Sequence, residues 1–497
     1  MSPDAYIPRR SHDRFWPLAL AGLCVIAGLA VFLLNGGPLF YFDTVGYVEQ
    51  GTSVLRMVVP HDWLVHGATA GPGGGGPAAP DDKTVNGSRS AIFSVFLAVL
   101  YHAHLFRAFP VVGAAFVLAA MWLPMRVALR RSEGVPPLWM VLLLPLLAAC
   151  AGSLPFYLAF LMPDIFAAVL ILVCASLVAF GPEMRRWEVL VSVALGLASV
   201  LAHPSHLLIV AVMVPVCFVL ALLGGRRGWW IAPLMVLAML LGGAGERLLF
   251  RSAVEVATKS EVTYFPFLTA RIIADGPGLA YLETHCPDPA IPTCLLHAAL
   301  SQSDDPMRLT ATHIVFATSP EIGSFRRMAL EDQKRVVQDQ RNFVREVVLT
   351  DPVGVLSSLV RNTANQADMN SVEMTVPSPG VAASVSEDLP AADLGAGRLI
   401  ADREAWLPQV ETAHRVVYLL SLALIGLLVL WPNRLMWQLR LFAAAILLGI
   451  VANAFICGAV SQPANRYGAR VIWLLPMLAA MLAVFAWPRH QDKGAGR

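Results

Sequence analysis

Ten long apolar stretches alternate with polar segments along the chain, and their interiors carry essentially no ionisable residue. A bilayer core needs about 20 apolar residues per helix, and fewer where neighbouring protein covers the helix ends. We therefore predict an all-α, polytopic integral membrane protein of about ten transmembrane helices. The predicted spans are residues 16–35, 109–127, 137–151, 165–180, 189–202, 207–223, 231–245, 416–431, 441–459 and 471–487.

The distribution of Lys and Arg among the loops predicts the orientation of these spans. With a cytoplasmic N-terminus, 15 positive residues fall in inner segments and only 6 in short outer loops. The inner set is Arg9, Arg10, Arg14, Arg126, Arg130, Arg131, Arg185, Arg186, Arg226, Arg227, Arg434, Arg440, Arg489, Lys493 and Arg497. The outer set is Arg56, Lys83, Arg89, Arg107, Arg466 and Arg470. We predict that both termini are cytoplasmic, in a bacterial inner membrane.

One further apolar run, residues 91–106, decides whether this orientation holds. If it crossed the bilayer, the Arg130–Arg131 pair would lie outside and every later loop would invert. We therefore predict a helix in or on the outer interface, which agrees with its polar end at Tyr101–His104. The alternative is an eleventh span, with which the excess of Lys and Arg on the inner side of the membrane would be lost.

Composition agrees with a membrane protein and excludes some functions. The 497 residues are 57% hydrophobic and only 14% charged, which a soluble domain of this size would not tolerate. A net charge of +2 gives no indication of nucleic-acid binding.

The spans divide the chain into three predicted parts. Residues 1–245 form an N-terminal membrane module with a first outer loop and the interfacial helix, and residues 416–497 form a C-terminal module with three spans. Between spans seven and eight, residues 246–415 form a periplasmic domain. Its helical periodicity over 325–350 and 353–365 is broken at Asp351-Pro352, and residues 376–397 are predicted to be a flexible loop.

Two of the seven cysteines lie in this predicted periplasmic domain. Cys286 and Cys294 are eight positions apart in a proline-rich segment, and an oxidising compartment favours a disulfide between them. A metal site that also uses His285 and His297 is the alternative. The other five cysteines lie in or beside spans and are predicted to be small packing residues.

Two carboxylates are predicted to lie on the outer face. Asp43 follows the first span among aromatic residues, and Asp164 follows Pro163 at the start of the fourth span. Each could simply cap a helix. The predicted topology, however, brings both to one side of the membrane, where they could act on the head group of a lipid-linked substrate.

Arginines on the same face could bind phosphate. Arg466 and Arg470 flank Tyr467 in the last outer turn, and Arg89 precedes the interfacial helix. Arginine binds phosphate oxygens bidentately, although a membrane-edge arginine can also extend to the interface without any ligand. Among weaker candidates, His61 and His66 in the first outer loop could join Asp43 and Asp164 in holding a metal, or could be ordinary solvated histidines.

The order of these features resembles the GT-C membrane glycosyltransferases, over roughly residues 15–180. The resemblance rests on a cytoplasmic N-terminus, a first outer loop that opens with Asp43, an interfacial helix, an Arg-rich inner turn, and Pro163-Asp164 at the fourth span. In that family an acid of the first outer loop is the catalytic base or a metal-site residue, and an acid of the second outer loop supports it. The first loop here has no Asp-x-Asp motif, which leaves the use of a divalent cation open.

The resemblance implies transfer of a sugar from a polyprenyl-phosphate-linked donor to an envelope glycan, lipid or protein. A transporter or flippase for an envelope precursor is the first alternative, although transporters usually place ionisable groups at mid-bilayer and contain inverted repeats. The second alternative is a non-catalytic subunit of an envelope complex, which would need neither Asp43 nor Arg466.

Overall fold

The computed structural model describes residues 12–60, 63–64, 84–131, 137–259, 261–319, 323–390, 392, 394, 397–432 and 435–486. Eight helical segments within these residues are long and apolar enough to cross a membrane. They are Trp16–Asn35, Phe106–Arg131, Ile165–Glu183, Pro204–Gly224, Ile231–Val256, Arg403–Leu430, Trp437–Val460 and Asn465–Ala486. The chain is therefore a mainly helical, multi-pass membrane protein.

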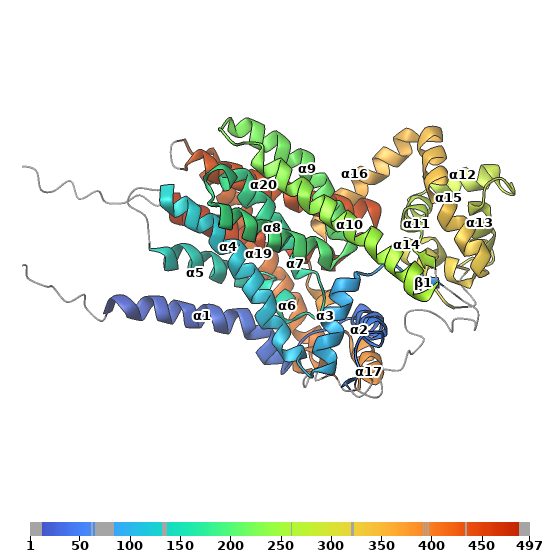
Figure 1. Cartoon of the computed structure of the whole chain (residues 1–497), viewed down its shortest axis with the longest axis horizontal. Helices are drawn as coiled ribbons and strands as arrows, with labels where there is room; N and C mark the ends of the chain where they lie inside the picture. The colour runs from blue at the N-terminus through green and yellow to red at the C-terminus, as the bar shows by residue number, and fades with distance from the viewer. Residues whose placement is uncertain are drawn as a thin grey trace, which may run out of the picture.

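The helices of these eight segments form one bundle with the shorter helices α5 and α8, which fills the left and centre of Figure 1. Its members are α1 (His12–Asn35), α4 (Phe109–Arg131), α5 (Leu138–Cys150), α7 (Ile165–Phe180), α8 (Arg186–Ala202), α9 (Pro204–Gly224), α10 (Ile231–Thr258), α19 (Arg403–Leu430), α20 (Trp437–Phe455), α21 (Asn465–Ile472) and α22 (Leu474–Ala486). Helix α7 is its centre, because every residue of α7 is buried and it packs against α4, α8, α9 and α20.

Two predicted spans form helices that are shorter than the eight segments above. Helix α5 has 13 residues and packs against α22, and α8 has 17 residues and packs against α7. Two other helices are longer than predicted. Helix α10 continues to Thr258, and α19 begins at Arg403, so residues 259–402 lie between these two helices, inside the predicted domain of 246–415.

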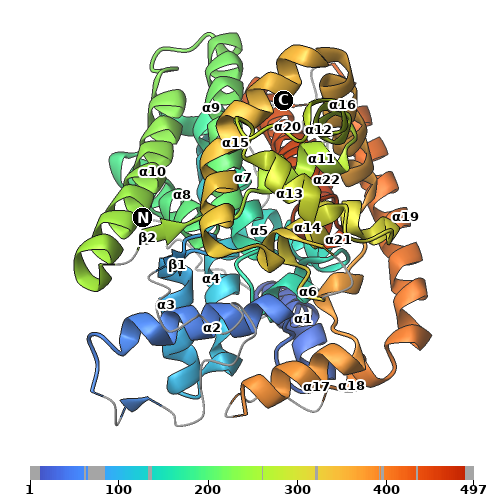
Figure 2. The same cartoon turned by 90° about the vertical axis from the view of Figure 1, so that its right-hand side faces the viewer.

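Helices α2 (Phe42–Leu55) and α3 (Ala91–His102) pack against each other beside the bundle. Helix α3 lies across the direction that α1 follows in Figure 1, and α2 is seen lengthwise in Figure 2. Helix α3 has only 12 residues, too few to cross a bilayer. Ile92 and Val99 remain exposed on it. The predicted helix at 91–106 therefore forms, and its place at the membrane interface stays a prediction.

We call residues 259–402 the inserted domain. The end of the helical bundle next to this domain is called the domain end. The inserted domain contains β2 (Glu261–Thr263), α11 (Phe267–Ala274), α12 (Pro277–His285), α13 (Thr293–Leu300), η4 (Pro306–Leu309), α14 (Ala311–Phe316), η5 (Phe325–Arg327), α15 (Leu330–Thr350), α16 (Pro352–Asp368), η6 (Glu373–Thr375), α17 (Pro379–Asp388) and α18 (Arg398–Ala401). Helices α11 to α16 gather at the right of Figure 1. Strand β2 pairs in parallel with β1 (Thr84–Asn86).

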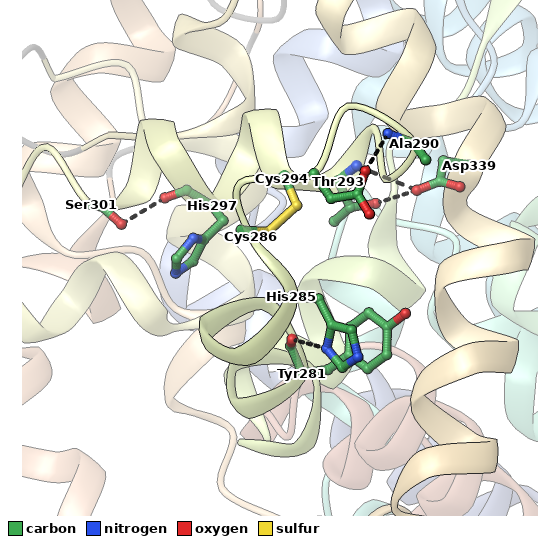
Figure 3. The surroundings of a disulfide bond; sticks show 10 residues. Tyr281, His285, Cys286, Ala290, Thr293, Cys294, His297, Ser301 and Asp339 are labelled. Carbon is green, nitrogen blue, oxygen red and sulfur yellow. Dashed lines mark hydrogen bonds between the residues drawn. A yellow bond between two sulfur atoms is a disulfide. The ribbon is translucent and has the colours of Figure 1, made fainter.

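The predicted disulfide is confirmed. The sulfur atoms of Cys286 and Cys294 are bonded at 2.01 Å, at the connection between α12 and α13 (Figure 3). The alternative metal site loses both thiolates to this bond. His285 instead stacks on the ring of Tyr281 at a centroid distance of 4.1 Å.

Two local predictions in the inserted domain have different outcomes. The predicted break in the helix at Asp351 is confirmed, because α15 ends at Thr350 and α16 begins at Pro352. The Asp351 carboxylate caps α16 by accepting a hydrogen bond from the Gly354 amide at 2.8 Å. The flexible loop predicted over 376–397 is wrong for 379–388, which form α17. There Ser378 accepts a hydrogen bond from the Val381 amide, and Pro379 occupies the first turn.

Candidate functional site

A short backbone pairing brings the first two candidate carboxylates together. After α1, the Leu39 amide donates to Ala159 and the Leu39 carbonyl accepts from Leu161, both at 2.8 Å. This pairing lies beside α6 (Leu154–Ala159), just before the start of α7. Asp43 in the first turn of α2 therefore lies near Asp164, which directly precedes α7.

Arg466 and Arg470 come from α21, a helix where the sequence suggested a turn. Residues four apart on a helix lie on one face, so both guanidinium groups point the same way. Arg466 Nη1 lies 3.2 Å from Asp43 Oδ2, and its Nε lies 3.5 Å from Asp164 Oδ1. Arg470 Nη1 lies 3.3 Å from the same oxygen of Asp164. Arg466 thus bridges the two carboxylates.

Arg89 completes the cluster from the segment before α3. Its Nη2 lies 3.3 Å from Asp43 Oδ1, so Asp43 contacts one arginine through each oxygen. The side chain crosses α2 at Gly46, where an added Cβ would lie 2.5 Å from Arg89 Cζ. Only glycine at this position allows the guanidinium to approach so closely.

Solvent reaches only one end of this cluster. The side chains of Asp164 and Arg470 are 1% and 0% exposed, and that of Arg466 is 6% exposed. Asp43 and Arg89 are 38% and 24% exposed. Asp43 is therefore the carboxylate that a substrate could reach, whereas Asp164 is placed to hold the two arginines.

Uncharged groups complete the surroundings of Arg470. Its Nε and Nη2 donate to Asn453 Oδ1 at 3.1 and 2.9 Å, and Nη2 also lies 3.2 Å from Ser205 Oγ. The same atom lies 3.1 Å from Cys457 Sγ, so this cysteine, predicted from the sequence to be a small packing residue, also contacts a charged group. Asn453 could not be singled out from the sequence, because one neutral amide does not interrupt the pattern of an apolar span.

Aromatic rings line the arginines. The Arg466 guanidinium lies over Tyr41 and Tyr467 at 5.3 and 5.1 Å from the ring centroids, and Arg470 lies 5.1 Å from the Tyr467 centroid. Such contacts stabilise a desolvated cation. Tyr467, predicted to bind phosphate, therefore acts here through its ring face on the two arginines.

The charges around Asp43 favour its ionised form. Burial opposes ionisation, but the Arg466 and Arg89 guanidiniums outweigh it and lower the pKa of the Asp43 carboxyl. Burial and the nearby charge of Arg89 lower the pKa of Arg326, a further cation whose position near the cluster no sequence pattern indicated. Among the residues that the structure describes, the three arginines Arg89, Arg466 and Arg470 form ion pairs with two carboxylates, those of Asp43 and Asp164, so positive charge exceeds negative charge in this described part of the cluster.

No metal site is evident among the residues that the structure describes. Within the part of the chain that the structure describes, no group of three or more His, Cys, Asp or Glu side chains could hold one. Asp43 and Asp164 contact arginines, and His61 and His66 lie outside the described residues. We therefore derive no step through a metal.

The cluster can bind an anion through its arginines and accept a proton at Asp43. Both capacities come from side chains that belong to four separate segments of the chain, before α3, in α2, before α7 and in α21. In comparisons with protein-family models, curated proteins and solved structures, nothing matches this chain.

Proposed function

We propose that this protein is a GT-C-type glycosyltransferase that moves a sugar from a polyprenyl-phosphate-linked donor to a cell-envelope acceptor. The observation that carries the proposal is the bridge made by Arg466 between Asp43 and Asp164, with Arg89 on the solvent side. Where arginines outnumber the carboxylates around them, their remaining positive charge favours binding of a phosphate group. An accessible carboxylate beside them suits removal of a proton from an acceptor hydroxyl.

The proposed topology gives this site a periplasmic location. Helices α5 and α8 would cross as shorter spans, which makes ten crossings and leaves both termini in the cytoplasm. The domain end would then face the periplasm of a bacterial inner membrane. The disulfide between Cys286 and Cys294 supports this orientation, because disulfides persist in oxidising compartments.

In the proposed reaction the acceptor oxygen bonds to the anomeric carbon as the bond from that carbon to the phosphate oxygen breaks. The Asp43 carboxylate takes the hydroxyl proton, and polyprenyl phosphate leaves with its charge neutralised by Arg89 and Arg466. Paired with both arginines and with a lowered pKa, Asp43 is a weak base. A phosphate that takes over these arginines would free the carboxylate and raise its basicity.

The proposal is tested by incubating the purified protein with polyprenyl-phosphate-linked sugars and an envelope-lipid acceptor fraction, and measuring released polyprenyl phosphate. Asp43→Asn should lower the rate by about 10²–10⁴-fold, the usual loss of a general base. The matched control is Asp304→Asn, an exposed carboxylate of the inserted domain, which should leave the rate unchanged. A fully active Asp43→Asn protein would contradict the proposal.

A transporter is the second candidate, and one observation favours it. Arg470 is fully buried within the helical segment Asn465–Ala486, and intramembrane charges often mark transport pathways. Its position near the start of that segment argues instead for a site at the membrane face. Vesicles loaded with a labelled precursor separate the two, since a transporter moves the precursor across the bilayer without releasing polyprenyl phosphate.

A further inference from the structure

We infer that Gln366, in the inserted domain, is a positioning residue that holds Arg466 in its anion-binding geometry. The role of Arg466 in binding an anion rests on the proposed function. The mechanical claim, that the inserted domain fixes the helix carrying Arg466, rests on contacts alone.

The side-chain amide of Gln366 forms two hydrogen bonds with the backbone just before α21. Gln366 Nε2 donates to the Ala464 carbonyl at 3.0 Å, and Gln366 Oε1 accepts from the Ala464 amide at 2.9 Å. The side chain is fully buried, so water cannot replace either bond. Ala464 is two residues before Arg466, and the paired bonds therefore fix where α21 begins.

Two further contacts join the same segments. Asn465 Nδ2 donates to Glu373 Oε1 at 2.6 Å, and Asn465 Oδ1 accepts from the Ser371 amide at 3.2 Å. Between the two arginines, a Cβ on Gly468 would lie 2.0 Å from the Met369 carbonyl oxygen. Residues 366–373 of the inserted domain thus lie directly against α21.

Helix α6 and the residue that precedes it also contact the backbone of α21. The Tyr157 hydroxyl donates to the Arg466 carbonyl, and Ser153 Oγ donates to the Ala469 carbonyl at 2.5 Å. Helix α21 is therefore held by contacts from the inserted domain and from the membrane bundle. If the inserted-domain support is lost, the start of α21 keeps only the bundle contacts, and Arg466 gains freedom.

The support is rigid because α16 is anchored within the inserted domain. Asn362 Nδ2 donates to both carboxylate oxygens of Asp275 at 2.9 Å, and Asp275 pairs with Arg271. The side chains of Asp275 and Arg271 are 8% and 11% exposed. A shift of α16 would break this buried network, so Gln366 is held in place from the core of the inserted domain.

The first test measures hydrogen–deuterium exchange of the peptide covering residues 464–470. Gln366→Met keeps the packing volume and removes both bonds to Ala464, so exchange there should become about tenfold faster. The control is Gln333→Met, which removes a 2.9 Å bond to the Met328 carbonyl within the inserted domain and should leave this peptide unchanged. Unchanged exchange in Gln366→Met would overturn the inference. If that variant does not fold, Asn465→Ala replaces it with the same expected result.

The second test measures binding of polyprenyl phosphate in detergent by native mass spectrometry. Gln366→Met should weaken binding about tenfold in the native background and have little effect when Arg466→Lys is also present, because its effect acts through Arg466. The same loss in both backgrounds would overturn the positioning role. If the unmodified protein binds no polyprenyl phosphate, the proposed function fails, whereas the exchange measurement still decides the positioning claim.

Discussion

Replacing Asp164 by Asn should destabilise the protein far more than the same change at Asp43. Asp164 is 1% exposed and is the carboxylate that contacts both Arg466 and Arg470. Asp164→Asn keeps the shape but leaves the fully buried Arg470 guanidinium without a counter-charge. Removing one partner of a buried ion pair typically costs about 3–5 kcal/mol.

The structure places this variant near the lower end of that range. Arg470 would keep its bonds to Asn453 at 2.9 and 3.1 Å and its contact with Ser205, which partly compensate for the lost charge. We therefore expect a loss of about 3 kcal/mol in the free energy of unfolding. The Asp43 side chain is 38% exposed, and ion pairs near solvent typically contribute only about 0–1 kcal/mol to the free energy of unfolding.

The assay is reversible unfolding of both variants in mixed micelles with increasing SDS, followed by helical circular dichroism. Asp164→Asn should unfold at clearly lower SDS than the native protein, and Asp43→Asn should stay close to it. Equal stability of the two variants would refute the conclusion that Asp164 is the structural carboxylate and Asp43 the accessible one.

Three further results are expected. Cys286→Ser/Cys294→Ser should lose about 2–3 kcal/mol of local stability and become more sensitive to limited proteolysis, and equal resistance would contradict this. Arg131→Cys should be labelled by a membrane-impermeant maleimide only after the cells are opened, and labelling in intact cells would overturn the topology. The folded pKa of Asp43 is lowered, so its stabilising contribution is complete above the unfolded value of about 3.9 and is lost as pH falls through the folded pKa. The difference in Tm between the native protein and Asp43→Asn should therefore shrink between pH 6 and about pH 3, and a constant difference would argue against the ion pairs.

Features with a strong pattern could be predicted from sequence. The apolar runs indicated the membrane helices, and the positions of Asp43, Asp164 and Arg466 relative to those runs suggested that they meet at one end of the bundle. The structure joins these three residues through ion pairs. Cysteines separated by eight positions in a proline-rich segment indicated the disulfide.

The remaining contacts depend on tertiary packing, which leaves no periodic signal. The backbone pairing of Leu39 with Ala159 and Leu161 uses only main-chain atoms, so side-chain patterns cannot show it. Asn453 and Gln366 are neutral amides whose roles depend on backbone groups and charges far away in the sequence. Arg326 lies in a short 3-10 helix of the inserted domain, and its nearness to Arg89 follows from how that domain sits on the bundle.

An experimental structure of the protein with bound polyprenyl phosphate would test the proposed anion site most directly. We predict that the phosphate oxygens contact the guanidinium groups of Arg89 and Arg466, and that the Asp43 carboxylate separates from both arginines. Asp164 should keep its contact with Arg470. A phosphate bound elsewhere, with the ion pairs of Asp43 to Arg89 and Arg466 intact, would contradict the proposed role of these residues.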